Sequence, residues 1–251
     1  MTYQTIRRMW HQLRHNLRVL RGHDRVKVWT NPPSQYKHSK LFPGGTYSPW
    51  LSDEQFSSVY GAIAGHTLVD QYRCYELWTI ASALRQVPGD ILEVGVWRGG
   101  TGVILASAVK NDPARIVYLA DTFEGVVKAG EHDPSYIGGE HADTSEQTVR
   151  VLIERCSLSN TQLLKGIFPE ETSIRVRGPI AMLHCDVDVY ESARGVVEWV
   201  LPRLSPGGVI VFDDYGFSGC EGVTRYGNEL SMQHDLRFIY NLNGHAIFIK
   251  Q

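Results

Sequence analysis

Residues 180–186 have the sequence Ile-Ala-Met-Leu-His-Cys-Asp, and residues 208–214 have Gly-Val-Ile-Val-Phe-Asp-Asp. Each run is apolar, short enough for a buried strand, and ends in acids: Asp186 in the first, Asp213 and Asp214 in the second. In an open parallel α/β sheet, ligands bind beyond the carboxyl ends of the strands, so these carboxylates should meet there. One of them could cap a helix. Because three would repel one another, we favour a site for a hard divalent cation such as Mg²⁺.

Strand and helix patterns alternate along the chain around these two runs. Strands are expected at 90–96, 115–120, 161–166, 180–185 and 209–212, and helices at 52–64, 70–86, 101–110, 144–156, 191–201 and 221–230. Two closing runs, 236–242 and 245–250, are joined through Asn243-Gly244, a hairpin signal. This order predicts an α/β fold: a doubly wound, mostly parallel seven-stranded sheet, with helices on both faces and an antiparallel C-terminal hairpin.

The composition is that of an ordinary globular protein, with 251 residues, 43% of them hydrophobic and 21% charged. No apolar run approaches the length of a membrane span, and no signal-peptide pattern is visible. We therefore expect a cytoplasmic protein whose four scattered cysteines are reduced thiols. Residues 1–65 are expected to form a basic helix and an irregular segment for covering the site or for oligomerisation, and residues 66–251 the α/β domain.

The charge is distributed unevenly along the chain. Residues 1–40 carry nine Lys and Arg and one acid, about +8, whereas the remainder carries 16 Lys and Arg and 26 acids, about −10. Residues 1–22 also place apolar side chains at helical spacing: Ile6, Met9, Trp10, Leu13, Leu17 and Leu20. Such a basic amphipathic helix could lie on an anionic membrane, but we favour packing on the domain or on a second subunit, in a homo-oligomer. No nucleic-acid-binding motif accompanies the charge, so no nucleic-acid partner is expected.

Residues 91–101, Ile-Leu-Glu-Val-Gly-Val-Trp-Arg-Gly-Gly-Thr, have the pattern of a strand, a glycine turn and a helix start. A dinucleotide fingerprint would place a glycine where Trp97 stands, so NAD and FAD are disfavoured. Glu93 beside Gly95 suits a cationic ligand, such as the amino and sulfonium groups of S-adenosylmethionine, although it could instead form a cap or a salt bridge. Asp121, which ends the next strand, suits the hydroxyls of a ribose.

Five segments between about residues 60 and 250 resemble the macrocin O-methyltransferase (TylF) family. They are Glu93-x-Gly95-Val96-Trp97-Arg98-Gly99-Gly100, Asp121-Thr122-Phe123-Glu124-Gly125, Gly166-Ile167-Phe168, Asp186-Val187-Asp188-Val189-Tyr190-Glu191-Ser192 and Leu204-Ser205-Pro206-Gly207-Gly208 with Asp213-Asp214-Tyr215. The resemblance implies a class I methyltransferase fold, S-adenosylmethionine as methyl donor, and Mg²⁺ held by three aspartates that correspond to Asp186, Asp213 and Asp214. The chain departs from the family at Val187, often a glycine, and at 169–173, where a Thr-Leu-Pro turn is usual.

The resemblance also implies a donor site. Its expected residues are Thr67, Glu93, Gly95, Val96, Trp97, Gly99, Asp121, Thr122, Phe123, Gly166 and Asp186, with Val69 and Arg73 in the segment that borders the donor. For catalysis we expect Asp186 and Asp188, with Asp188 either the general base or a residue that orients the acceptor. His132 and His141, in the loop 126–143, are weaker base candidates. That loop is too long for a simple connection, which favours an acceptor-binding or lid role.

These observations predict an S-adenosylmethionine- and Mg²⁺-dependent O-methyltransferase acting on a hydroxyl of a sugar or glycoside. A catechol-like phenol is the alternative acceptor, because it also offers two adjacent oxygens to a cation. A non-catalytic nucleotide-binding scaffold could share the fold, since fold does not determine function. A scaffold would have no need to keep three carboxylates that repel one another, which favours the enzyme.

Overall fold

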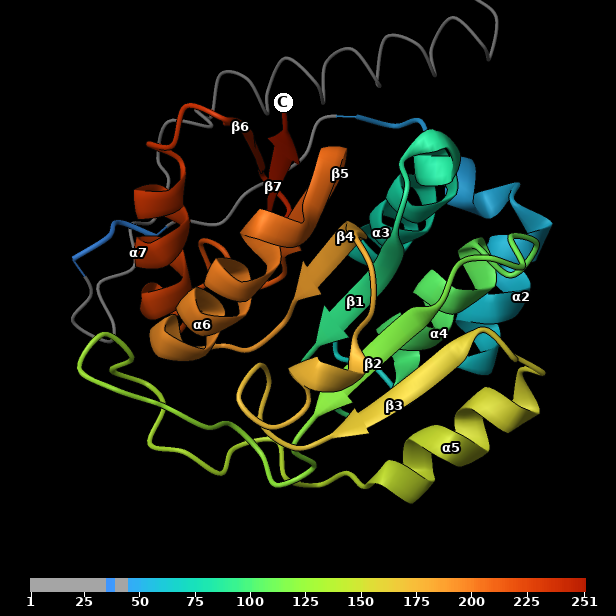
Figure 1. The fold of residues 1–251 in the computed structure, drawn as a ribbon, viewed down its shortest axis with the longest axis horizontal. Coiled ribbons are helices and arrows are strands. Elements are labelled where there is room, and N and C mark those ends of the chain that lie inside the picture. Colours follow the sequence, from blue (N-terminus) through green and yellow to red (C-terminus); the bar gives the residue numbers. More distant parts are fainter. Residues whose placement is uncertain (1–34, 39–44) are drawn as a thin grey trace, which may run out of the picture. The chain divides into compact units, whose positions relative to one another are not determined.

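The computed structural model describes residues 35–38 and 45–251. The chain divides into two compact units, residues 1–43 and 44–251, and the second holds the α/β domain (Figure 1). The helix predicted within residues 1–22 lies outside the described residues. Residues 45–65, which we grouped with the N-terminal segment, belong to the second unit, where helix α2 (Glu54–Ala62) buries Phe56 in the core.

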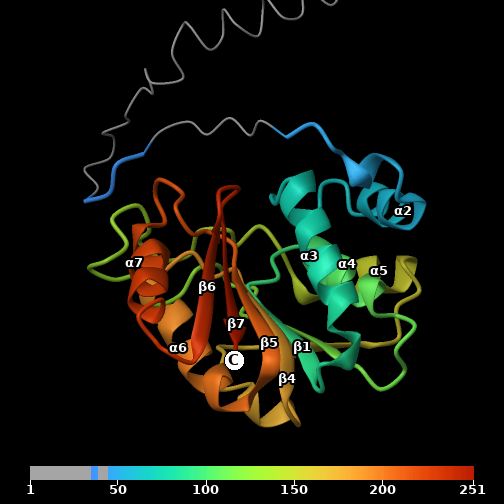
Figure 2. The ribbon, with the colours of Figure 1, turned by 90° about the horizontal axis from the view of Figure 1, so that it is seen from above.

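The domain is built on a seven-stranded sheet with the strand order β3-β2-β1-β4-β5-β7-β6. Its parallel strands are β1 (Asp90–Val94), β2 (Val117–Asp121), β3 (Thr161–Lys165), β4 (Ile180–Cys185) and β5 (Leu204–Phe212). The hairpin β6 (Leu236–Asn241) and β7 (His245–Lys250) completes the sheet, with β7 antiparallel to both β5 and β6 (Figure 2). The predicted fold class is confirmed, and the strand order reverses between β1 and β4, where this class of sheet binds its ligands.

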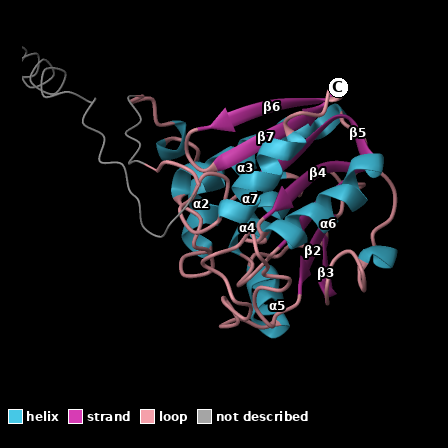
Figure 3. Ribbon diagram, turned by 90° about the vertical axis from the view of Figure 1, so that its left-hand side faces the viewer, coloured by secondary structure: helices cyan, strands magenta, loops and turns pink. Residues whose placement is uncertain are grey.

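Helices cover both faces of the sheet (Figure 3). On one face lie α2, α3 (Gln71–Ala83), α4 (Gly100–Ala108) and α5 (Glu146–Arg155); on the other lie α6 (Tyr190–Val200) and α7 (Glu221–Leu230). Side chains alternate between the two faces along each strand. Ile91 therefore packs into the core beneath α3 and α4, whereas Leu92 packs into the core beneath α6 and α7. In the described part of the chain no helix is long and apolar enough to cross a bilayer.

The helix starts follow ordinary capping chemistry. Asp53 accepts a hydrogen bond from the Phe56 amide, and Asp70 accepts from the amides at the start of α3. The largest boundary difference is in β5, which begins at Leu204 and not at 209. Leu204 pairs with Ile180, and the register then shifts before Met182, because the turn-forming Pro206-Gly207-Gly208 interrupts the regular ladder without ending it.

Candidate functional site

A cavity opens beyond the carboxyl ends of β1, β2, β4 and β5. The predicted residues that line it are Thr67, Val69, Arg73, Gly95, Val96, Trp97, Asp121, Thr122, His141, Gly166, Asp186, Asp188, Asp213 and Asp214. Gly99 and Phe123, predicted with them, lie in the same two turns but outside the lining that the described residues form. We call the part built on β1 and β2, where the sequence predicts the methyl donor, the donor half, and the part built on β4 and β5, which holds the aspartates, the acid half.

Asp121 holds the glycine turn of the donor half in place. Its Oδ2 accepts hydrogen bonds from the amides of Val96 and Trp97 at 2.7 and 2.8 Å, and its Oδ1 accepts one from the Phe123 amide at 2.6 Å. Trp97 and Phe123 have φ angles of 46° and 57°, in the left-handed region that bulky residues rarely adopt. The hydrogen bonds to one carboxylate therefore fix two unfavourable backbone conformations at the mouth of the cavity.

Gly95 brings the donor half into contact with the acid half. Its φ is 89°, and a Cβ on this residue would lie 1.6 Å from the carbonyl oxygen of Asp186. The Asp186 amide in turn donates to the Val94 carbonyl at 2.9 Å. A side chain at position 95 would push the two halves apart, so only glycine is compatible with this approach.

Trp97, which occupies the position of a fingerprint glycine, supports the long loop 126–143. Its indole Nε1 donates to Asp143 at 2.8 Å. Arg98 forms an ion pair with the same carboxylate at 2.6 Å and lies over the indole ring at 4.5 Å. Thr144, just after the loop, donates to the Trp97 carbonyl. The end of the loop is thereby tied to the donor turn.

Glu93 is not among the residues that line the cavity in the described chain. Its side chain is 0% exposed, and its Oε1 lies 2.9 Å from Nδ1 of His184 in β4. Strand alternation explains this placement, because Glu93 lies within β1 and points to a face of the sheet and not beyond its end. Contact between Glu93 and a donor stays a prediction; the neighbour that the structure gives it is a buried imidazole.

The acid half brings together the three aspartates predicted as metal ligands. Asp186, Asp213 and Asp214 each offer an oxygen within 4.8 Å of the others. Asp213 directly follows β5, and its amide donates to the Cys185 carbonyl at 3.1 Å, which sets the two strand ends side by side. Oδ2 of Asp214 is buried and has no hydrogen-bond partner among the described residues. An orphaned buried carboxylate oxygen indicates that the cluster lacks a positive partner.

The three carboxylates differ in their electrostatics. Burial, reinforced by the neighbouring carboxylates, raises the pKa of both Asp186 and Asp214 well above the usual range. Burial would also raise the pKa of Asp213, but the nearby imidazoles and the guanidinium of Arg73 outweigh it and hold that pKa below the usual range. Neighbouring cationic groups therefore compensate the charge of Asp213, whereas burial and the neighbouring carboxylates prevail at Asp186 and Asp214.

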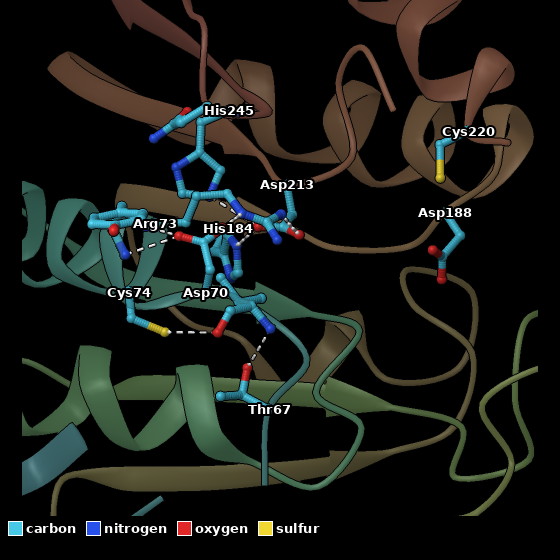
Figure 4. A network of polar contacts seen from close by, with 12 residues as sticks. Thr67, Asp70, Arg73, Cys74, His184, Asp188, Asp213, Cys220 and His245 are labelled. Carbon is cyan, nitrogen blue, oxygen red and sulfur yellow. Dashed lines mark hydrogen bonds and ion pairs between the residues drawn. The ribbon is translucent and has the colours of Figure 1, made fainter. Parts of the chain in front are cut away.

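The partners of Asp213 come from helix α3 and from the two strands that flank β5 (Figure 4). Arg73 Nη1 donates to Oδ2 at 2.6 Å, and His245 Nε2 lies 2.9 Å from Oδ1. His184 Nε2 lies 3.8 Å from the same Oδ1, too far for a hydrogen bond. We expected Arg73 near the donor and predicted no role for either histidine. The sequence feature that points to His184 is its place in the otherwise apolar run 180–185.

Asp188 lies in the cavity on a tight turn. Its φ is 63°, and the Val189 amide donates across it to the Val187 carbonyl at 2.7 Å, the pattern of a γ-turn. Tyr136 Oη donates to Asp188 Oδ1 at 2.7 Å. Burial raises the pKa of Asp188 despite this hydrogen bond. A non-glycine residue in such a conformation at the edge of a cavity is a common feature of functional sites.

The loop 126–143 delivers Tyr136 through a buried anchor that the sequence did not reveal. Asp133 is 2% exposed, and it accepts hydrogen bonds from the Tyr190 amide at 2.9 Å and from the Gly130 amide at 3.0 Å. This fixes the loop to the start of α6. Of the two histidines considered as bases, His141 lines the cavity, whereas His132 packs on the Tyr190 ring and is outside the lining as described.

The sequence model of the macrocin-O-methyltransferase (TylF) family matches residues 58–249. The chain belongs to this family. It is an O-methyltransferase similar to the 8-demethyl-8-(2,3-dimethoxy-alpha-L-rhamnosyl)-tetracenomycin-C 4'-O-methyltransferase of Streptomyces olivaceus, with 35% identity over 71% of this chain and 70% of that protein. It is 34% identical to the mycinamicin III 3''-O-methyltransferase of Micromonospora griseorubida, over 64% of this chain and 70% of that protein.

Solved structures agree with the fold. The O-methyltransferase NovP superposes with a TM-score of 0.64 at 24% identity, over 74% of this chain and 82% of that chain. The calicheamicin methyltransferase CalS11 superposes with a TM-score of 0.59 at 17% identity, over 83% of this chain and 99% of that chain. At these identities the likeness concerns the architecture of the domain alone.

Proposed function

We propose that this O-methyltransferase transfers the methyl group of S-adenosylmethionine to a hydroxyl of a sugar or glycoside, with Mg²⁺ as cofactor. The observation that carries the proposal is the shared cavity, in which the glycine turn of β1 faces the cluster of Asp186, Asp213 and Asp214. The names of the two relatives place their reactions on a rhamnosyl-tetracenomycin and on mycinamicin III, which supports a glycoside acceptor.

The donor set of the acid half fits Mg²⁺. It consists of carboxylates, which hard cations prefer, and it includes the partnerless Oδ2 of Asp214. Burial, reinforced by the neighbouring carboxylates, raises the pKa values of Asp186 and Asp214, and a bound cation would oppose both effects. Asp186, Asp213 and Asp214 would hold the ion, which when bound supplies the charge that orients and acidifies an acceptor hydroxyl.

The donor half would hold S-adenosylmethionine on the turn Gly95-Val96-Trp97. Asp121 Oδ1 accepts one protein hydrogen bond, so it retains capacity for a ribose hydroxyl. Thr67, Thr122 and Gly166 line the same region. Holding the methyl carbon and the acceptor oxygen in line and close together is the main task of such a site, and alignment can supply up to about 7–11 kcal/mol.

Asp188 is suited to receive the acceptor's proton. S-adenosylmethionine, when bound, would supply the methyl group and leave as S-adenosylhomocysteine. The Asp188 carboxylate would take up the proton that the acceptor hydroxyl loses in this transfer. Tyr136 occupies one lone pair of Oδ1 and keeps the carboxylate pointing into the cavity. General-base assistance of this kind typically contributes about 10²–10⁴-fold.

The test is a methyl-transfer assay with S-adenosylmethionine labelled in the methyl group. The acceptor panel contains rhamnosides, other deoxysugar glycosides and simple catechols, each with Mg²⁺ and with a chelator. We expect label in a saccharide with Mg²⁺ and none with chelator. Full turnover in chelator would exclude the cation, and label in catechols alone would favour the phenol acceptor.

Assembly and location stay predictions. A homo-oligomer, a cytoplasmic location and a peripheral membrane contact through residues 1–22 all concern segments or surroundings that the described residues do not include. A truncation that starts near Gly22 separates the readings: a change in mass by light scattering supports packing on a second subunit, and a loss of binding to anionic vesicles supports membrane contact.

A further inference from the structure

Asp213 is held by a donor at each of its two oxygens. Arg73 donates to Oδ2 at 2.6 Å and His245 Nε2 lies 2.9 Å from Oδ1. Asp213 is 3% exposed and His245 is 0% exposed, so water does not compete for these bonds. Figure 4 shows both side chains directed at this carboxylate. Two donors on different oxygens fix the rotation of a carboxylate, which one donor cannot do.

Helix α3 supplies both Arg73, which contacts Asp213 directly, and Glu76, which contacts His245. Arg73 and Glu76 are three residues apart and so lie on the same face of the helix. Glu76 Oε2 lies 2.5 Å from His245 Nδ1 and accepts from Asn243 Nδ2 at 3.1 Å. Asn241 also donates to Glu76. The result is a continuous chain from Glu76 through His245 to Asp213, with the hairpin β6–β7 fastened to the same carboxylate of α3.

The register of the sheet brings His245 to Asp213. In the antiparallel pair of β5 and β7, Phe212 is opposite Ala246, so the next position of each strand sets Asp213 beside His245. His245 thus has both ring nitrogens engaged, Nδ1 by a carboxylate and Nε2 by Asp213. Both partners are carboxylates, so the ring donates to both only with a proton on each nitrogen, and the two contacts together fix its orientation. Carboxylates that hold a metal ion are commonly supported by such outer hydrogen bonds.

A different reading of the same residues is a second metal centre formed by His184, Asp213 and His245, whose ligand atoms also lie within 4.8 Å of one another. The guanidinium of Arg73, 2.6 Å from Asp213 Oδ2, places a permanent positive charge beside such a centre. The 2.9 Å separation of His245 Nε2 and Asp213 Oδ1 is an ordinary hydrogen-bond distance. Both facts favour a hydrogen-bonded support over a buried ion.

We propose that His245, backed by Glu76, is a positioning residue that fixes Asp213 so that its free lone pairs face Asp186 and Asp214. This inference rests on the proposed function, because it concerns the cation of that site. Supports of this kind typically change metal affinity by about 10- to 100-fold when they are removed. The C-terminal hairpin, which contributes no lining residue within the described cavity, would then tune the affinity of the site for its ion.

The experiment measures binding of Mn²⁺, as a probe for the cation, by the loss of its free electron paramagnetic resonance signal on titration with protein. His245→Phe keeps the ring and removes both contacts, His245→Gln keeps an amide able to donate to Asp213, and Glu76→Gln keeps size and removes charge. His234→Phe is the matched control, an exposed histidine beyond the opposite end of β6. Binding of S-adenosylhomocysteine by calorimetry in chelator reports an intact fold and donor half.

We expect the dissociation constant for Mn²⁺ to rise by about 10- to 100-fold in His245→Phe and by less in His245→Gln and Glu76→Gln. His234→Phe should match the wild type, and S-adenosylhomocysteine binding should be unchanged in all four variants. If His245→Phe does not fold, the other two variants decide, and at least one of them must weaken Mn²⁺ binding.

Three results would overturn the inference. In the first, His245→Phe binds S-adenosylhomocysteine and Mn²⁺ as the wild type does, which leaves the proposed function standing. In the second, the purified wild type contains one equivalent of Zn²⁺ that His245→Phe lacks, which makes the histidines a metal centre. In the third, the wild type binds no Mn²⁺, which removes the cation of the proposed function and this inference together.

Discussion

The two halves of the cavity differ in whether their carboxylate oxygens have hydrogen-bond partners. In the donor half, Asp121 accepts three backbone hydrogen bonds and fixes the turn of Val96 and Trp97. In the acid half, Asp214 Oδ2 has no partner among the described residues, and burial raises the pKa of both Asp186 and Asp214. The turn of the donor half is held by a carboxylate that has its hydrogen-bond partners, whereas the acid half contains two carboxyl groups whose ionised forms the fold disfavours.

This difference indicates what each half does. A donor that binds to a finished cradle meets groups already in position, so little reorganisation opposes binding. A buried group of carboxylates is costly without a cation, and that cost persists only where the charge is used. We therefore expect the donor half to set the orientation of the methyl donor, and the acid half to hold electrostatic strain that a cation would relieve.

The largest effect should come from Asp188→Asn, which tests whether the acid half also performs the proton transfer. Asn keeps the shape and the hydrogen bond with Tyr136 but cannot accept a proton, so kcat should fall by about 10²–10⁴-fold. The affinity for S-adenosylhomocysteine should not change, because the donor half is untouched. A variant with wild-type kcat would leave Asp188 as a group that only orients the acceptor.

The stability of the metal-free protein should fall between about pH 6.5 and pH 9. The carboxylates of Asp213 and Glu93 overcome the effect of burial and raise the pKa of His184 from 6.5 to about 9. A histidine whose pKa is higher in the folded than in the unfolded protein stabilises the fold fully at pH values below the unfolded pKa. That stabilisation is lost as the pH rises through the folded pKa. The raised pKa values of Asp186 and Asp214 act in the same direction, because their ionised forms are disfavoured in the fold.

His184 accounts for at most about 3 kcal/mol of this loss. Denaturant unfolding in chelator at pH 6.5 and pH 9 measures it. Mg²⁺ should reduce the part that comes from the carboxylates. Stability that is flat or rises over this range would mean that the acid half is neutralised in some other way.

Asp121→Asn tests the donor half, because it removes the carboxylate that accepts three backbone hydrogen bonds in that half. In this variant an NH₂ group replaces one carboxylate oxygen. That NH₂ group is a donor, and it faces backbone N–H groups that donate to the oxygen in the wild type. Loss of hydrogen bonds to a charged acceptor costs about 1.5–3 kcal/mol, so S-adenosylhomocysteine affinity should fall by about 10- to 100-fold. Mn²⁺ binding should be unchanged. Equal weakening of both ligands would show that the two halves form one unit.

The sequence predicted the fold well because each local pattern agrees with the sheet. Apolar runs that end in acids predicted β4 and β5, and Asn243-Gly244 predicted the hairpin. The strand-end rule also brought Asp186 to Asp213 and Asp214, since it depends only on topology. The boundary of β5 was less predictable, because pairing across a glycine-rich interruption depends on the neighbouring strand.

Contacts that depend on register or loop conformation could not be predicted in the same way. His245 reaches Asp213 only because Phe212 pairs with Ala246, and no local pattern specifies that register. Tyr136 reaches Asp188 through a loop without periodicity, held by the buried Asp133. Glu93, by contrast, is directed to a face of the sheet by strand alternation, although it lies only two residues before Gly95.

The smallest effect, and the sharpest test of the comparison, is the stability of Asp214→Asn. If the acid half stores electrostatic strain, replacing a carboxyl group whose ionisation the fold disfavours should stabilise the metal-free protein at neutral pH by about 1–2 kcal/mol, or a few degrees in Tm. In Mg²⁺ the order should reverse, because the wild type gains the free energy of binding the ion and the variant does not. Asp235→Asn, which alters an exposed carboxylate beyond the other end of the hairpin, should change neither value. Thermal unfolding of the three proteins with chelator and with Mg²⁺ gives the comparison. A metal-free Asp214→Asn protein that is less stable than the wild type would mean that Asp214 is part of a satisfied network, and the acid half would then be as complete as the donor half.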